Sequence, residues 1–120
     1  MKVLFIEKTE DTPSVLLNQK DGIFEIEGRS LPEDALGFYN PVMEWIKEYG
    51  KSPNDSTDLT FKLEYFNSAS SKVILKVLNL LAEVKGARVV WCAAEDDDEI
   101  LDAGREYEED VKIPFEFRMY

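Results

Sequence analysis

The apolar residues of this chain follow two periodicities that alternate along its length, and this alternation restricts the fold more than any other feature. Strand-like runs lie at residues 3–6, 15–17, 23–27, 59–66, 89–93 and 115–119. Helix-like segments, in which apolar residues recur every three or four positions, lie at 35–49, 73–82 and 100–111. Strands separated by helices favour an α/β fold, with a mostly parallel or mixed sheet of about five to six strands and three helices.

Local signals at two boundaries add detail to this fold. Asp21-Gly22 lies between two apolar runs and predicts a β-hairpin, because Gly adopts a positive φ without steric cost. Ser30 and Glu33 have the spacing of a capping box, which predicts that Ser30 begins the first helix.

Two strand-like runs predict which side chains enter the core. The run at 59–66 alternates most clearly, with one face formed by Leu59, Phe61, Leu63 and Tyr65. The run at 89–93 is apolar without alternation, which is typical of a strand covered on both faces. Cys92 within it is therefore expected to be a small core residue rather than a nucleophile.

The composition excludes several classes of function. The 120 residues include 14 Lys and Arg against 25 Asp and Glu, and the net charge of −11 repels nucleic acid and anionic membrane surfaces. Histidine is absent, which excludes Ser-His-Asp and Cys-His catalysis and His-based zinc sites. A single cysteine and the lack of a signal-peptide pattern or a membrane-length apolar run predict a cytoplasmic protein. The length predicts one domain over residues 1–120, and no motif calls for a cofactor.

A polar patch at residues 67–72, Asn-Ser-Ala-Ser-Ser-Lys, separates the clearest strand from the most apolar helix. Ligands and modifications of α/β proteins concentrate at such strand-to-helix junctions, where the helix N-terminus presents free N–H groups. The simplest interpretation is that one serine caps the helix and the patch has no other role. The alternative is a further role for the patch, which three serines favour because one is enough for a cap. A phosphoryl group here would add about −1.5 to −2 charges at a helix end that tolerates them.

An acidic run, Glu95-Asp96-Asp97-Asp98-Glu99, opens the last helix-like segment. Ten acidic residues and one basic residue between 95 and 110 give this segment a charge of −9, which leaves about −2 for the rest of the chain. The run has three alternative roles: a solvated helix start, an acidic partner-binding face, or a divalent-cation site. Its spacing lacks the alternation of a calcium-binding loop, so no metal ligand is assigned.

Several longer segments carry distinctive combinations of residues: Thr-Pro-Ser-Val at 12–15, Gly22 to Asp34, Phe-Tyr-Asn-Pro-Val-Met-Glu-Trp-Ile at 38–46, Leu63 to Lys72, and the acidic run with Ala103-Gly104. Together they resemble the SiaC family of bacterial regulatory phosphoproteins over nearly the whole chain. The segments at 38–46 and 64–67 are the most specific. The resemblance implies a fold like the STAS domains of anti-sigma factor antagonists.

The resemblance also implies a function. The implied function is that of a non-enzymatic switch: a serine/threonine kinase phosphorylates proteins of this kind, a PP2C-type phosphatase reverses this, and in the characterised system the unmodified form binds and activates a diguanylate cyclase. The family's phosphoacceptor is a threonine after Tyr-x-Asn, and Ser68 occupies that position here. Ser70 and Ser71 are alternative acceptors.

The resulting hypothesis is a signalling switch without catalytic residues that is phosphorylated on Ser68, with Asn67, Ser70 and Lys72 shaping the partner-binding surface. Two other classes of protein remain open. One is a small metal-dependent hydrolase that uses the carboxylates at 95–99, and the other is a scaffold that carries no modification.

Overall fold

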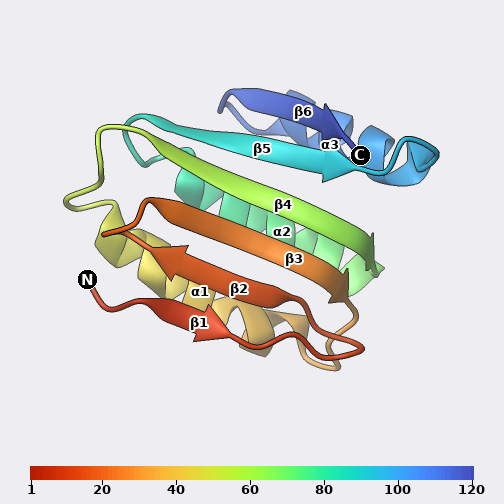
Figure 1. Ribbon diagram of the computed structural model, residues 1–120, viewed down its shortest axis with the longest axis horizontal. Coiled ribbons are helices and arrows are strands. Elements are labelled where there is room, and N and C mark those ends of the chain that lie inside the picture. Colours follow the sequence, from red (N-terminus) through yellow and green to blue (C-terminus); the bar gives the residue numbers. More distant parts are fainter.

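The computed structural model describes residues 1–120 and consists of one six-stranded sheet with three helices (Figure 1). The strands are β1 (Leu4–Ile6), β2 (Ser14–Asn18), β3 (Ile23–Ser30), β4 (Thr57–Phe66), β5 (Ala87–Ala93) and β6 (Phe115–Met119). The helices are α1 (Ala35–Tyr49), α2 (Ser68–Leu81) and α3 (Asp98–Asp110). This confirms the predicted α/β fold with a mixed sheet and three helices.

The strands lie in the sheet in the same order as in the chain, from β1 to β6. β1, β2 and β3 are antiparallel, which confirms the predicted hairpin, and Gly22, the last residue of the turn at 19–22 between β2 and β3, has a positive φ of 68°. From β3 to β6 neighbouring strands are parallel, and each pair is joined through a helix. The carboxyl ends of the four parallel strands, β3, β4, β5 and β6, therefore lie side by side. This end of the sheet is here called the carboxyl edge.

All three helices cover the same face of the sheet, and the other face is open (Figure 1). The covered face holds one continuous apolar core, in which Trp91 of β5 is the largest fully buried side chain. The indole ring of Trp91 contacts Phe61 and Tyr107, and its Nε1–H donates to the Ile100 carbonyl oxygen at 2.8 Å. Trp91 thereby fixes α3 against the sheet.

The first helix begins later than the sequence predicts. Asp34 is its N-cap and its carboxylate accepts a hydrogen bond from the Gly37 N–H at 3.0 Å. Ser30 instead ends β3 and is fully buried, so the predicted capping box is wrong. A buried strand end gives the Ser30 hydroxyl partners in the core, which an exposed helix cap would not have.

A bulge interrupts β4 immediately before the polar patch. Gly28 of β3 lies opposite Leu63 but Arg29 lies opposite Tyr65, so Glu64 is an extra residue in β4. The extra residue reverses the alternation, and Tyr65 is 47% exposed while Phe66 turns inward and packs edge-on against Trp91. The prediction that Tyr65 shares the core face of Leu63 is therefore wrong.

β5 is buried on both faces, but only one of these faces is covered by helices. Cys92 points to the open face, since its neighbours Trp91 and Ala93 belong to the core beneath the helices. The prediction that Cys92 is a buried residue is confirmed, and burial raises the pKa of its thiol. The cover on this face comes from side chains of adjacent strands, including Arg118, which lies opposite Cys92 on β6.

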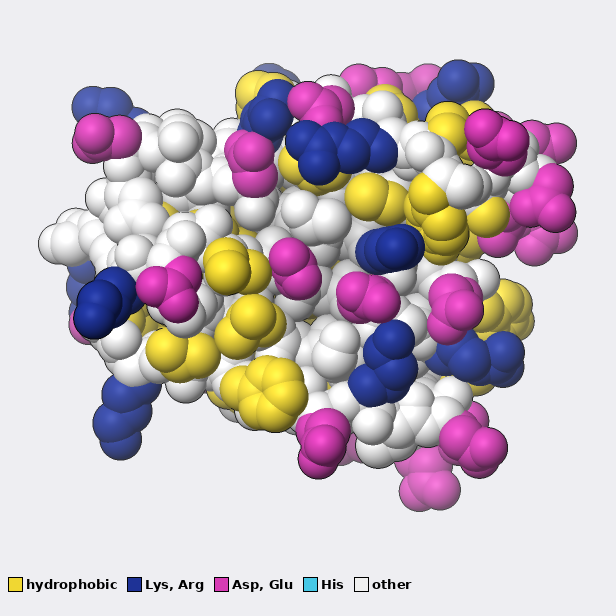
Figure 2. Space-filling view, in the orientation of Figure 1, with side chains coloured by type: hydrophobic (Ala, Val, Ile, Leu, Met, Phe, Trp, Pro, Cys, Tyr) yellow, Lys and Arg dark blue, Asp and Glu magenta, His cyan; other side chains and the backbone are white.

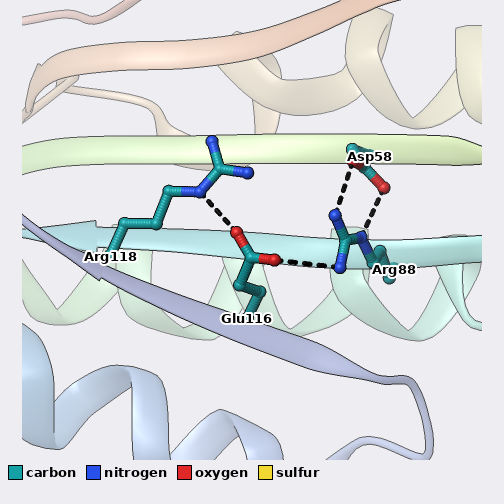
Figure 3. Close-up of polar contacts among 4 residues, drawn as sticks. All are labelled: Asp58, Arg88, Glu116 and Arg118. Atoms are coloured by element: carbon teal, nitrogen blue, oxygen red, sulfur yellow. Dashed lines mark hydrogen bonds and ion pairs between the residues drawn. The ribbon is translucent and has the colours of Figure 1, made fainter.

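A chain of ion pairs crosses the open face and ties β6 to the sheet (Figure 3). The Arg88 guanidinium donates to both carboxylate oxygens of Asp58 at 2.7 and 3.0 Å, and to Glu116 at 3.0 Å. Glu116 also accepts from Arg118. The hydrogen bond from Arg88 lowers the pKa of Asp58, and the hydrogen bond from Arg118 is the main reason why the pKa of Glu116 is lowered.

None of the three helices is both long and apolar enough to cross a membrane.

We predict that Gly104→Ala destabilises the protein by about 1–3 kcal/mol, because overfilling a packed core forces its side chains apart. A Cβ at position 104 would overlap the indole ring of Trp91, whose Cγ lies 2.8 Å from that point. Urea unfolding measures the loss, and Asp102→Ala, an exposed change on the same helix, should alter stability by less than about 0.5 kcal/mol. Equal stability of Gly104→Ala and the parent would contradict this packing.

We predict that Arg88→Met lowers the melting temperature near neutral pH and has less effect in acid. Asp58 and Glu116 have lowered pKa values in the folded state, so their stabilising contribution is present above the pKa of the unfolded chain and is lost as the pH falls. The difference between the two proteins should shrink below about pH 4. Lys85→Met changes the net charge equally but breaks no ion pair of the chain, and should show no such dependence on pH.

Candidate functional site

The polar patch lies at the carboxyl edge, where the chain leaves β4 and enters α2. The N-cap of α2 is Asn67, whose side-chain oxygen accepts from the Ser70 N–H at 2.9 Å. The alternative in which a serine caps this helix is therefore wrong. The three serine hydroxyls are all left for other contacts, and each has a different environment.

Ser70 belongs to the interior. It is 0% exposed, and its hydroxyl donates to the Ser30 carbonyl oxygen at 3.0 Å and accepts from the Ser30 hydroxyl at 2.9 Å. The Ser30 hydroxyl also lies 2.6 Å from the Tyr39 hydroxyl. Burial is the main reason why the pKa of Tyr39 is raised to about 12, so this phenol stays protonated. We call Ser30, Tyr39 and Ser70 the hydroxyl cluster.

The burial of Ser70 corrects its predicted role on the partner-binding surface, because a side chain with no exposed area cannot touch a partner in this conformation. Ser71 is half-buried, and it too is held inward. Its hydroxyl lies 3.1 Å from the Tyr107 hydroxyl, which donates to the Ser71 carbonyl oxygen at 2.8 Å.

Ser68 differs from both neighbours because it is exposed. It is the first residue of α2, and its hydroxyl makes none of the side-chain hydrogen bonds that hold Ser70 and Ser71. Lys72 is also exposed, and it lies one helical turn further on the same side of α2. A hydroxyl at this position is open to an approaching enzyme, and the positive end of the helix dipole favours an added anion.

The acidic run lies at the same edge of the sheet, because it follows β5. Asp97 is the N-cap of α3 and accepts from the Ile100 N–H at 3.1 Å, while Asp98 and Glu99 occupy the first turn. These positions suit carboxylates because the helix dipole stabilises them. The structure brings no three acidic side chains together in an arrangement that would hold a metal ion.

Two parts of the site were not predicted from the sequence. The hydroxyl cluster joins positions 30, 39 and 70, and a hydrogen bond between residues 40 apart has no local signal. The exposure of Tyr65, three residues before Ser68, follows from the bulge in β4 and contradicts the local alternation.

Comparison with known proteins agrees with the resemblance noted in the sequence. Residues 6–120 match a family described as the SiaC family regulatory phosphoprotein. The chain belongs to the SiaC family. One relative is an uncharacterized protein of Pseudomonas aeruginosa (strain UCBPP-PA14), which is 27% identical over 119 residues, covering 96% of this chain and 94% of the relative.

Solved structures of SiaC share the fold. The crystal structure of apo-SiaC from Pseudomonas aeruginosa is 24% identical, with a TM-score of 0.88 over 98% of this chain and 99% of that chain. A chain from the crystal structure of the diguanylate cyclase SiaD in complex with its activator SiaC, also from Pseudomonas aeruginosa, is 23% identical, with a TM-score of 0.90 over 98% and 99% of the two chains. The six strands and three helices are thus the architecture of SiaC.

We predict that Ser70→Ala destabilises the protein by about 1–3 kcal/mol, because the buried Ser30 hydroxyl loses its acceptor. Ser68→Ala is the matched control, because it also removes a serine hydroxyl, but from an exposed residue two positions earlier in the chain. It should change stability by less than about 0.5 kcal/mol. Urea unfolding compares the two variants. Similar losses in both would contradict the different roles given to these serines.

Proposed function

We propose that this protein is a non-enzymatic signalling switch that is reversibly phosphorylated on Ser68. The observation that carries the proposal is the exposed Ser68 hydroxyl at the start of α2, beside two serines whose hydroxyls are held by internal hydrogen bonds. Membership of a family of regulatory phosphoproteins supports it. A serine/threonine kinase would add the phosphate and a PP2C-type phosphatase would remove it.

The phosphate would act on the surface rather than on the fold. Asn67 caps α2 and the hydroxyl cluster holds its first turn, so neither depends on the Ser68 hydroxyl. A phosphoserine adds about −1.5 to −2 charges and three acceptor oxygens at the carboxyl edge. Lys72 lies one turn away, where its ammonium group would pair with the phosphate and no longer be free for a partner.

We further propose that the unmodified form binds and activates a diguanylate cyclase. The fold shared with SiaC, which activates SiaD in the Pseudomonas aeruginosa complex, supports this choice of partner. Asn67, Ser68 and Lys72 would lie in the contact, and the phosphate would break it by adding charge to an edge that already holds the acidic run. Residues 1–120 would act together as one regulatory domain. The likeness to STAS domains remains a prediction.

We predict that peptide mapping of the protein purified from its own cells finds phosphate on Ser68, and that a PP2C-type phosphatase removes it. Incubation with a kinase from the same organism and ATP should restore the modification, because Ser68 alone among the three serines is exposed. Ser68→Ala should abolish the incorporation, while Ser71→Ala should leave it intact. Modification confined to positions outside 68–71 would overturn the assignment.

The effect on the partner is tested with three forms of the protein: the parent, Ser68→Ala, and protein carrying phosphoserine at position 68. The parent and Ser68→Ala should bind and stimulate a diguanylate cyclase of the same organism, and the phosphoserine form should bind it with a dissociation constant at least about tenfold higher, which corresponds to ~1.4 kcal/mol of binding free energy. Equal stimulation by all three would instead indicate a scaffold that does not respond to modification.

A further inference from the structure

The outer edge of β1 is free, and exposed apolar side chains gather around it. β1 forms hydrogen-bonded pairs with β2 alone and ends the sheet. Eight large apolar side chains of the chain are exposed, and half of them belong to this corner of the molecule: Met1, Val3, Phe5 and Ile23. Singly exposed apolar residues are ordinary, but a group of them beside an unpaired strand edge is typical of a contact surface.

The apolar group lies on the open face of the sheet. Phe5 is 64% exposed and lies opposite Leu16 on β2, which in turn lies opposite Glu25 on β3. No helix covers this face, and Figure 2 shows apolar side chains gathered over the β1–β2 region. The patch formed by Val3, Phe5, Leu16 and Ile23 is here called the β1 patch.

We infer that the free edge of β1 pairs with β1 of a second copy of this chain. Antiparallel pairing about a twofold axis would join the two sheets into one and place the two β1 patches side by side on the same face. In a register centred on Leu4, Val3 lies opposite Phe5 of the other copy, and Lys2 lies opposite Ile6. This register brings two apolar residues together and sets no two like charges opposite each other.

The distribution of charge favours a second copy at this edge rather than at the other one. The segment from 95 to 110, with its charge of −9, includes α3, which packs against β5 and β4 near the β6 end of the sheet. Pairing through β6 would bring two such segments together, whereas pairing through β1 keeps them at opposite ends of the dimer. At physiological salt, charges further apart than about 8 Å are largely screened.

The start of β1 is also held in place before any partner arrives. The Trp45 Nε1–H of α1 donates to the Lys2 carbonyl oxygen at 2.8 Å, which fixes the chain just before the strand. An edge that is already ordered loses less conformational entropy on pairing than a mobile one. A strand of only three residues makes few hydrogen bonds, so the β1 patch must supply much of the binding free energy.

Sedimentation equilibrium of the full chain over a wide range of concentration tests the inference. The parent protein should dimerise reversibly, and Phe5→Glu should raise the dimer dissociation constant at least about tenfold by placing like charges within the patch. Val3→Glu should act in the same direction. Both residues are exposed, so the far-ultraviolet circular dichroism spectra of the variants should match that of the parent.

Met119→Glu is the matched control, because Met119 is a 46% exposed apolar residue on β6, at the opposite edge of the sheet. It adds the same charge and should leave the dissociation constant within about twofold of the parent. A parent protein that stays monomeric at every concentration would overturn the inference. So would a dimer that survives Phe5→Glu and Val3→Glu, or one that Met119→Glu weakens as strongly.

Discussion

The carbonyl oxygen of Ser30, at the end of β3, accepts hydrogen bonds from two groups at the start of α2: the Asn67 N–H at 3.2 Å and the Ser70 hydroxyl at 3.0 Å. The same serine reaches Tyr39 of α1 through its own hydroxyl. One residue thus joins β3, α1 and α2 at the carboxyl edge. Because these groups are buried, leaving any of them unpaired costs free energy, and the position of Ser68 on the surface is set by bonds in which Ser68 takes no part.

The order and type of the helices and strands could be predicted, because each contributes an apolar face whose period shows in the sequence. The start of the first helix could not. Ser30 and Glu33 satisfy a capping pattern, yet burial at the end of β3 gives Ser30 better partners than a helix end would. A local sequence pattern shows only which contacts a residue can make with its near neighbours in the chain. The contacts that Ser30 makes instead are with Tyr39 and Ser70, which are 9 and 40 residues away.

At the candidate site, too, part of the arrangement could be predicted from the sequence and part could not. Its position between β4 and α2 follows from the sequence, because a polar patch between an alternating run and an apolar helix leaves few other arrangements. Which of the three serines is exposed depends on the direction in which α2 leaves the sheet. That direction depends in turn on the bulge at Glu64, which changes the side of β4 on which each later residue lies. No residue type in this part of β4 predicts the bulge.

The burial of Ser70 has a consequence for where a phosphate could be added. While the chain is folded, Ser70 is hidden and Ser68 is exposed, so the kinase proposed above would need little sequence preference to select Ser68. During synthesis or after unfolding, all three hydroxyls are equally open. A phosphate placed on Ser70 at that stage would have to be buried beside the Ser30 carbonyl oxygen, which carries partial negative charge, so the marked chain could not regain this structure. Phosphate found on Ser70 would therefore indicate that the molecule was unfolded when it was modified.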